Sequence, residues 1–154
     1  MTSTKNVETV ERFIPAPPAA IFDLLADPSR HRDIDGSGTV RDRTAGSERL
    51  ALGSRFRVNM KVGVAYSMES TIIEFVTDRR IAWQSRSPNK VISLFGGGRI
   101  WRYELEPVDG GTLVRESWDI SQERGARFLV RRLRKTTREA MIKTLARIEE
   151  LVTA

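Results

Sequence analysis

The chain has 154 residues, 40% of them hydrophobic and 30% charged, with a formal net charge of +6 and no cysteine. This length and composition predict one globular domain over residues 1–154 and exclude general disorder. The missing cysteines exclude a disulfide framework and a thiolate metal site. The N-terminal stretch has no continuous apolar core, and no segment approaches the roughly 20 apolar residues that span a bilayer, so we expect a cytoplasmic protein.

The first elements are predicted to be one strand and two short helices. Apolar residues alternate along Val7–Ile14, as in a first strand. Pro17 and Pro18 suit the first turn of a helix, where a missing N–H costs nothing, and Pro28 ends that helix. A short second helix is expected at Ser29–Asp33.

The only histidine of the chain lies near two aspartates, in the order His31, Asp33 and Asp35. No nucleophile elbow accompanies these residues, and a single histidine is too little for a metal site, so neither a triad nor a metal ion is expected. The segment 35–38 reads as a turn leaving the small helices. We therefore place His31 and Asp35 at the rim of a pocket, with His31 as a candidate gate.

Five further strands are predicted after this turn. Strict alternation of apolar and polar residues over Arg55–Val62 indicates a half-buried strand. The connections are short, and parallel pairing would need long crossovers, so the sheet is an antiparallel meander. The other four expected strands are Tyr66–Val76, Arg80–Ser87, Arg99–Val108 and Thr112–Ile120.

The glycine run "FGGGR", Phe95 to Arg99, is predicted to be a loop. It joins two strands and opens no helix, whereas a phosphate loop needs a strand, a loop and a helix. We expect a flexible connection at a pocket mouth, with Phe95 on the rim.

One long helix is expected from near Arg124 to the C-terminus, roughly 40 Å in length. Between Arg124 and Arg138 there are seven basic residues and no acidic one, which could attract anionic lipid or nucleic acid. A solvated helix face is the simpler interpretation, because 21 of the 26 cationic residues of the chain are arginine. The apolar stripe of this helix comprises Leu129, Leu133, Thr137, Ala140, Met141, Thr144, Leu145, Ile148, Leu151 and Val152.

Alternation on the last three strands directs three tryptophans and one tyrosine to the face that the helix must cover. These aromatic residues are either a filled core or the lining of a ligand cavity, since Trp and Tyr carry polar groups that need partners when buried. Glu116 falls on the same face, where a bare carboxylate is costly. Three arrangements are therefore open for Glu116. A bulge turns it outward, another group pairs with its carboxylate, or it serves as a polar anchor in a water-containing cavity. The inward rows are Ile81, Trp83 and Ser85; Trp101, Tyr103 and Leu105; and Val114, Glu116, Trp118 and Ile120.

The segments "PPAAIFDLLADPSRH" and "WRYELEPVDGGTLVRESWD", in this order of elements, resemble the polyketide cyclase/dehydrase branch of the START-like (SRPBCC) superfamily. The resemblance covers nearly the whole chain. It implies an α+β helix-grip fold like that of the birch-pollen allergen, in which a curved seven-stranded antiparallel sheet wraps around the long terminal helix. It also implies a pocket for an apolar or amphipathic small molecule. The expected pocket residues are Met60, Met68, Trp83, Trp101, Tyr103, Glu116, Trp118, Leu133, Thr137 and Met141.

Three functions stay open on this basis. The first is non-catalytic binding or transport of a hydrophobic ligand, such as a lipid or a polyketide-like molecule. The second is a cyclase or dehydratase that uses Glu116 or His31 as acid–base and Tyr103 to orient an oxyanion. The third is an interaction module that uses the basic helix face on an anionic membrane or a protein. We expect no cofactor and no specific nucleic acid, and either a monomer or a homodimer.

Overall fold

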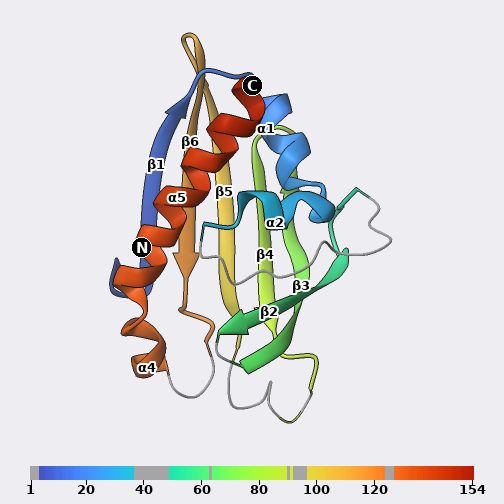
Figure 1. Cartoon of the computed structure of the whole chain (residues 1–154), viewed down its shortest axis with the longest axis vertical. Helices are drawn as coiled ribbons and strands as arrows, with labels where there is room; N and C mark the ends of the chain where they lie inside the picture. Colours follow the sequence, from blue (N-terminus) through green and yellow to red (C-terminus); the bar gives the residue numbers. More distant parts are fainter. Residues whose placement is uncertain (1–3, 37–48, 63, 90, 92–96, 124–126) are drawn as a thin grey trace.

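The computed structural model describes residues 4–36, 49–62, 64–89, 91, 97–123 and 127–154. Its centre is one antiparallel sheet in the order β1-β6-β5-β4-β3-β2, so that the first strand pairs with the last (Figure 1). A β-bulge between Ile72 and Glu74 interrupts the pairing of β3 with β4. The strands are β1 (Val7–Ile14), β2 (Arg55–Val62), β3 (Val64–Val76), β4 (Arg80–Arg86), β5 (Arg99–Val108) and β6 (Gly111–Asp119).

The strand bounds agree closely with the alternation in the sequence, because burial on one face of a sheet has a period of two residues. The resemblance predicts seven strands, and this number is wrong for the described residues, which form six. The physical reason is that only six described segments have a strand pattern. The seventh strand was implied by the resemblance alone. Residues 37–48, between the small helices and β2, lie outside the description.

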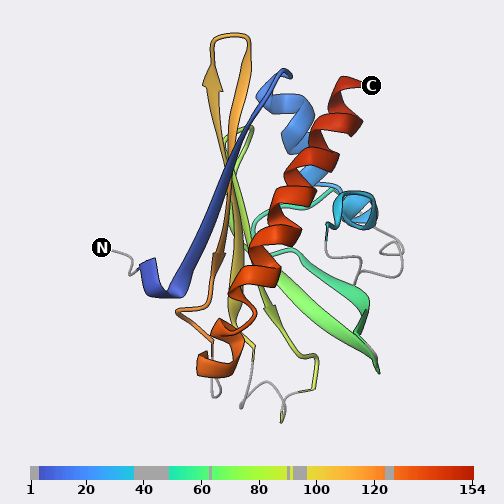
Figure 2. The same cartoon turned by 60° about the vertical axis from the view of Figure 1, so that its left-hand side comes forward.

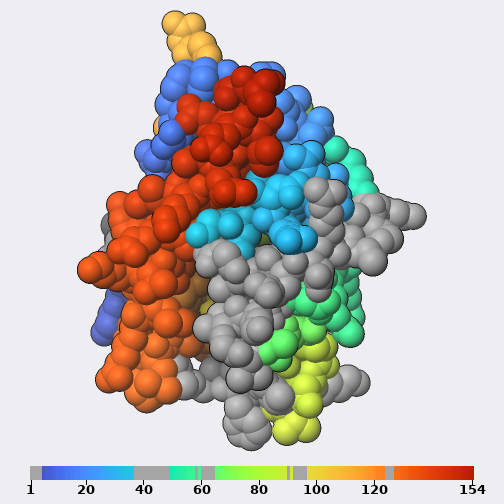
Figure 3. Space-filling view, viewed as in Figure 1, coloured from blue at the N-terminus to red at the C-terminus, as the bar shows by residue number. Residues whose placement is uncertain are grey.

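The helices lie on one side of the sheet (Figure 2). After β1 comes α1 (Pro18–Leu25), as predicted, and a 3-10 turn η1 (Thr4–Asn6) precedes β1. The second helix predicted at Ser29–Asp33 is divided into the 3-10 turn η2 (Pro28–Arg30) and α2 (His31–Ile34). In the space-filling view, α1, α2 and α5 (Arg134–Thr153) form a continuous surface over the upper part of the sheet (Figure 3). No helix in the described ranges is both long and apolar enough to cross a membrane.

The prediction of one unbroken terminal helix is wrong. The chain forms a short helix α4 (Arg127–Arg131) and then α5, with a break at residues 132–133. At the break, the amides of Arg132 and Leu133 bond to carbonyls three residues back, which tightens and turns the chain. As a result Leu133 is 48% exposed, and the apolar stripe reaches the core only from Met141 onward.

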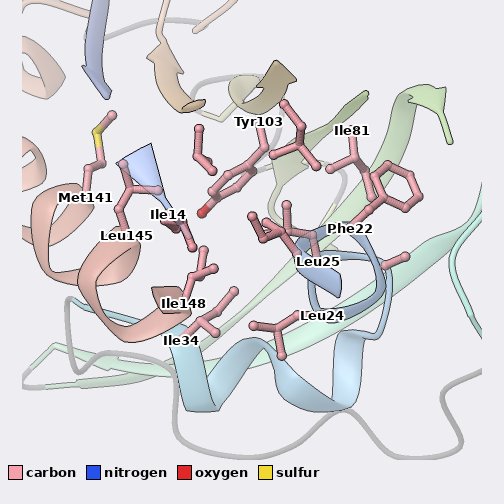
Figure 4. Packing of buried hydrophobic residues seen from close by; sticks show 14 of the residues in the cluster. Ile14, Phe22, Leu24, Leu25, Ile34, Ile81, Tyr103, Met141, Leu145 and Ile148 are labelled. Atoms are coloured by element: carbon pink, nitrogen blue, oxygen red, sulfur yellow. The ribbon is translucent and has the colours of Figure 1, made fainter. Parts of the chain in front are cut away.

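The core lies between the inner face of the sheet, α1 and α5. Figure 4 shows the ring of Tyr103 reaching from the sheet in among the side chains of α1 and α5. Each inward row predicted on the last three strands contributes buried residues to this core, among them Ile81, Tyr103 and Trp118. From α5 the buried residues are Met141, Thr144, Leu145 and Ile148.

The opposite, outer face of the sheet is covered by ion pairs. Glu74 on β3 accepts a hydrogen bond of 2.7 Å from Arg102 on β5, and Arg80 lies between Glu74 and Glu104. A pocket of about 340 Å³ is lined mainly by charged residues. Its lining residues are Val76, Arg79, Arg80, Glu104, Leu105, Glu106, Leu113 and Arg115.

Candidate ligand-binding site in the interior

The segment after α2 is held against α5 by a glycine. The Gly36 amide donates a hydrogen bond of 2.9 Å to Thr144 Oγ1. A Cβ atom at Gly36 would lie 2.2 Å from the carbonyl oxygen of Ala140 and 2.6 Å from the amide nitrogen of Thr144. The backbone therefore approaches α5 more closely than any other residue type allows. This contact positions Asp35 beside the interior.

Four of the predicted site residues form one continuous line across the interior. The ring of His31 stacks on Trp83 with a centroid distance of 5.0 Å, and Trp83 lies 5.6 Å from the ring of Tyr103. The Tyr103 hydroxyl donates a hydrogen bond of 2.8 Å to Glu116 Oε1. Tyr103 and Glu116 are direct cross-strand partners on β5 and β6, which explains the contact.

Glu116 is a buried carboxyl group whose environment favours the neutral form. Only 2% of the residue is exposed. The pKa of Glu116 is raised to about 8, chiefly by burial; the hydrogen bond from Tyr103 acts to lower this pKa, and the negative charge of Asp35 acts to raise it. The same burial, with Glu116 and Asp35 nearby, raises the pKa of Tyr103 well above its usual value. At neutral pH the interior therefore holds a protonated acid next to a neutral phenol.

His31 is also buried, at 8% exposed. Its Nε2 lies 2.8 Å from the Leu25 carbonyl oxygen, and since a carbonyl only accepts, Nε2 carries the proton. Burial lowers the pKa of His31, so the ring is neutral near pH 7. Its other nitrogen, Nδ1, is the one that remains for proton transfer. Among the described residues no three His, Asp or Glu side chains come together as metal ligands.

The three tryptophans form a row across the sheet. Trp83, Trp101 and Trp118 are successive cross-strand partners on β4, β5 and β6. Trp118 is 2% exposed, whereas Trp83 and Trp101 are only half-buried and pack against the edge of the core. The inner face is thus less completely covered at Trp83 and Trp101 than at Trp118.

The remaining predicted lining residues are not all in the interior. Met141 is 1% exposed, and Thr137 and Met68 are half-buried. Leu133 lies at the break between α4 and α5, is exposed, and is not part of the core. Two predicted residues cannot be assessed, because Phe95 and the side chain of Met60 lie outside the description.

Some contributors to the interior were not among the predicted site residues. Phe56 contacts both His31 and Trp83 edge-to-face, with centroid distances of 5.2 and 5.9 Å. Its inward position in the alternating pattern of β2 was the available signal. Ser70 and Ser85 share a buried hydrogen bond of 2.8 Å, which only the register of β3 against β4 could reveal.

Three arginines of the basic segment 124–138 contact the N-terminal elements. Arg134 and Arg138 both donate to the carboxylate of Glu8 on β1, and Arg138 Nη1 lies 2.6 Å from Glu8 Oε1. Arg131 donates to Asn6 Oδ1 at 2.9 Å. Burial alone would raise the pKa of Glu8, but the two arginines lower it overall. These arginines therefore anchor the terminal helices to the edge of the sheet.

An antiparallel sheet with one face covered by a terminal helix, and aromatic residues gathered on that face, agrees with the helix-grip arrangement that the sequence resemblance implies. Residues 7–153 match the sequence profile of the family described as polyketide cyclase/dehydrase and lipid transport. The chain belongs to this family.

Relatives and solved structures agree with this assignment. The uncharacterised protein Rv0088 of Mycobacterium tuberculosis is 33% identical over 108 residues, which are 69% of this chain and 44% of that protein. The matching part of the chain thus spans less than half of this curated relative. Protein Ms6760 of Mycobacterium smegmatis has the same fold, with a TM-score of 0.73 and 18% identity over 97% of this chain and 92% of that one. DynU16, from the dynemicin biosynthetic locus, aligns with a TM-score of 0.68 and 13% identity over 97% of this chain and 48% of that one.

Proposed function

We propose that this protein binds or transports a hydrophobic or amphipathic small molecule in its interior, without catalysing a reaction on it. One observation carries the proposal. Among the described residues, Glu116 Oε2 and Trp118 Nε1 are buried and have no hydrogen-bond partner. Buried polar atoms are nearly always paired, so two unpaired ones on the same face of β6 are expected where a ligand supplies the partners.

The lining also favours an apolar ligand. The aromatic line from His31 through Trp83 to Tyr103 offers large apolar surfaces, and Trp101 presents a half-buried ring beside it. The outer pocket is the competing site on this protein. Five of its eight lining residues are charged, so it suits polar molecules better. The family description, which includes lipid transport, agrees with an apolar ligand.

A cyclase or dehydratase is the second candidate, and one observation favours it. A general acid works best with a pKa near the working pH, and Glu116 has a pKa of about 8. The hydrogen bond from Tyr103 holds this carboxyl group in one position on the inner face of the sheet. If Glu116 acts in this way, Glu116→Gln abolishes turnover of a substrate while leaving its binding intact, and wild-type rates in that variant would remove Glu116 from the mechanism.

Binding is tested with the neutral fluorescent dye Nile red. Trp101→Ala removes a half-buried ring from the inner face, so we expect dye affinity to fall by about fivefold or more while the domain stays folded by circular dichroism. The matched control is Leu113→Ala, which shortens a side chain lining the outer pocket and should leave the affinity unchanged. If Leu113→Ala weakens binding of Nile red and Trp101→Ala does not, the dye binds at the outer face and the proposal is rejected.

A further inference from the structure

The short helix α4 and the break that follows it expose large apolar side chains in a segment rich in arginine. Phe128 is 63% exposed, Leu129 is 47% exposed and Leu133 is 48% exposed. Large apolar side chains that gather on a surface mark sites of interaction more often than single ones do. Together with three exposed cations they form the α4 patch, which comprises Arg127, Phe128, Leu129, Arg132, Leu133 and Lys135.

The fold fixes the direction in which α4 presents this patch. Val130 packs against the core, and Arg131 donates a hydrogen bond of 2.9 Å to Asn6 Oδ1. With 3.6 residues per turn, Phe128 and Leu129 lie on the side of the helix opposite to these two contacts. A rotation that buried the apolar side chains would break both contacts. The patch is therefore held in an exposed position.

The cations of the basic segment 124–138 fall into two groups. Arg131, Arg134 and Arg138 bind Asn6 and Glu8 and hold the terminal helices to the rest of the fold. The cations of the α4 patch are different, because no carboxylate of the described residues forms an ion pair with them. The segment itself contains no acidic residue. The patch therefore combines apolar side chains with positive charge that is not neutralised by an ion pair.

This combination favours an anionic bilayer over other partners. Phenylalanine and leucine enter the boundary between headgroups and acyl chains, while arginine and lysine bind anionic headgroups. A nucleic acid would neutralise the cations but would leave the apolar side chains without a partner. A stable protein interface buries about 800 Å² and about 20–30 residues on each side, which is far more than the patch offers. A bilayer uses both kinds of side chain in a small contact.

We propose that α4 docks the protein onto an anionic lipid bilayer. Phe128, Leu129 and Leu133 insert at the headgroup boundary, and the cations of the patch bind the headgroups. Figures 1 and 2 show α4 at the end of the fold opposite the C-terminus, so this end faces the bilayer. Docking goes beyond the proposed function and does not rest on it, because Nile red binding in the interior and vesicle binding through α4 are measured separately.

Flotation of the full chain with vesicles tests the docking. One set of vesicles is pure phosphatidylcholine, and the other contains about 30% phosphatidylglycerol. Each cation near an anionic surface contributes about fivefold, so we expect at least tenfold stronger partition onto the anionic vesicles at about 0.1 M salt. The preference should be largely lost at about 1 M salt, where the Debye length falls from about 10 Å to about 3 Å. Equal partition onto both sets, or none onto the anionic set, would overturn the proposal.

Matched variants locate the contact. Arg132→Glu should weaken partition onto the anionic vesicles by about tenfold or more, whereas Arg32→Glu, the same charge change at an exposed position of α2, should weaken it by less than about twofold. Phe128→Ala should weaken it by about fivefold, whereas Leu52→Ala, at a position that is 69% exposed, should not. Equal losses in each variant and its control would overturn the proposal.

A label reports directly which part of the surface enters the bilayer. The chain has no cysteine, so Phe128→Cys and Leu52→Cys each provide one attachment point for bimane. Bimane emission should shift to shorter wavelength on anionic vesicles at position 128 and stay unchanged at position 52. A shift at position 52 alone would place another face on the bilayer and overturn the proposal. If the protein instead binds a DNA duplex through Arg132 and does not float with vesicles, the partner is nucleic acid and the proposal is wrong.

Discussion

The buried carboxyl group of Glu116 should make the stability of the protein fall as the pH rises from about 4.5 to about 8. Its pKa is about 8 in the folded protein and 4.5 as a model value. Between these values the unfolded chain has released the proton and the folded chain still holds it. The contribution of this group to the free energy of unfolding is fully present below about pH 4.5. It is lost as the pH rises toward and through 8, at about 1.4 kcal/mol per pH unit between the two pKa values.

Glu116→Gln isolates this effect, because the amide keeps an acceptor for Tyr103 but does not titrate. From pH 6 to pH 8 the wild type should lose about 2 kcal/mol of unfolding free energy relative to the variant. His31, whose pKa is lowered by burial, changes stability in the opposite direction below about pH 6.5, but it does so in both proteins and cancels. Urea unfolding, followed by tryptophan fluorescence at pH 6, 7 and 8, measures the difference. Parallel pH profiles would show that Glu116 is not held neutral in the interior.

Two further predictions concern how α5 is held against the rest of the fold. Gly36→Ala forces a Cβ atom against the backbone of α5, so we expect a loss of about 1–3 kcal/mol in urea unfolding, and an unchanged midpoint would show that the segment after α2 does not dock as described. Glu8→Gln removes the shared partner of Arg134 and Arg138 and should cost about 1 kcal/mol at low salt and less at high salt. The matched control is Glu11→Gln, which breaks a more exposed pair with Arg115 and should cost less. A loss of unfolding free energy in Glu11→Gln equal to or larger than that in Glu8→Gln would show that Glu8 does not anchor the terminal helices.

The strands could be predicted from the sequence because their signal is local. Alternation in Arg55–Val62 and Arg99–Val108 identifies both strands to the residue, since each buried position is decided by the face on which it falls. The turn at 109–111 is short enough to make β5 and β6 neighbours. The inward direction of Glu116 follows from the same alternation.

The break before α5 could not be predicted, because it depends on tertiary contacts. The heptad-like spacing continues through Leu129 and Leu133, yet both are exposed. Arg131 and Arg134, on either side of the break, bind Asn6 and Glu8 at the far end of the chain. Such pairings carry no signal in the local sequence.

The candidate site was predictable in its members but not in its arrangement. Its aromatic residues and Glu116 follow from alternation, whereas the Tyr103–Glu116 bond requires the exact register of two strands. The influence of Asp35 on Glu116 requires a small helix to dock onto α5 through Gly36. Sequence spacing cannot supply that long-range contact.

The central claim is that the inner face of the sheet receives a hydrophobic or amphipathic ligand. It is tested most directly by the indole N–H signals of the three tryptophans in ¹H–¹⁵N correlation spectra, recorded at pH 6.5 while Nile red is added. We predict that the Trp118 signal moves downfield as its Nε1–H gains an acceptor, and that the Trp101 signal shifts with it. Three unmoved indole signals at saturating probe, or shifts confined to residues of the outer pocket such as Leu113, would contradict the claim.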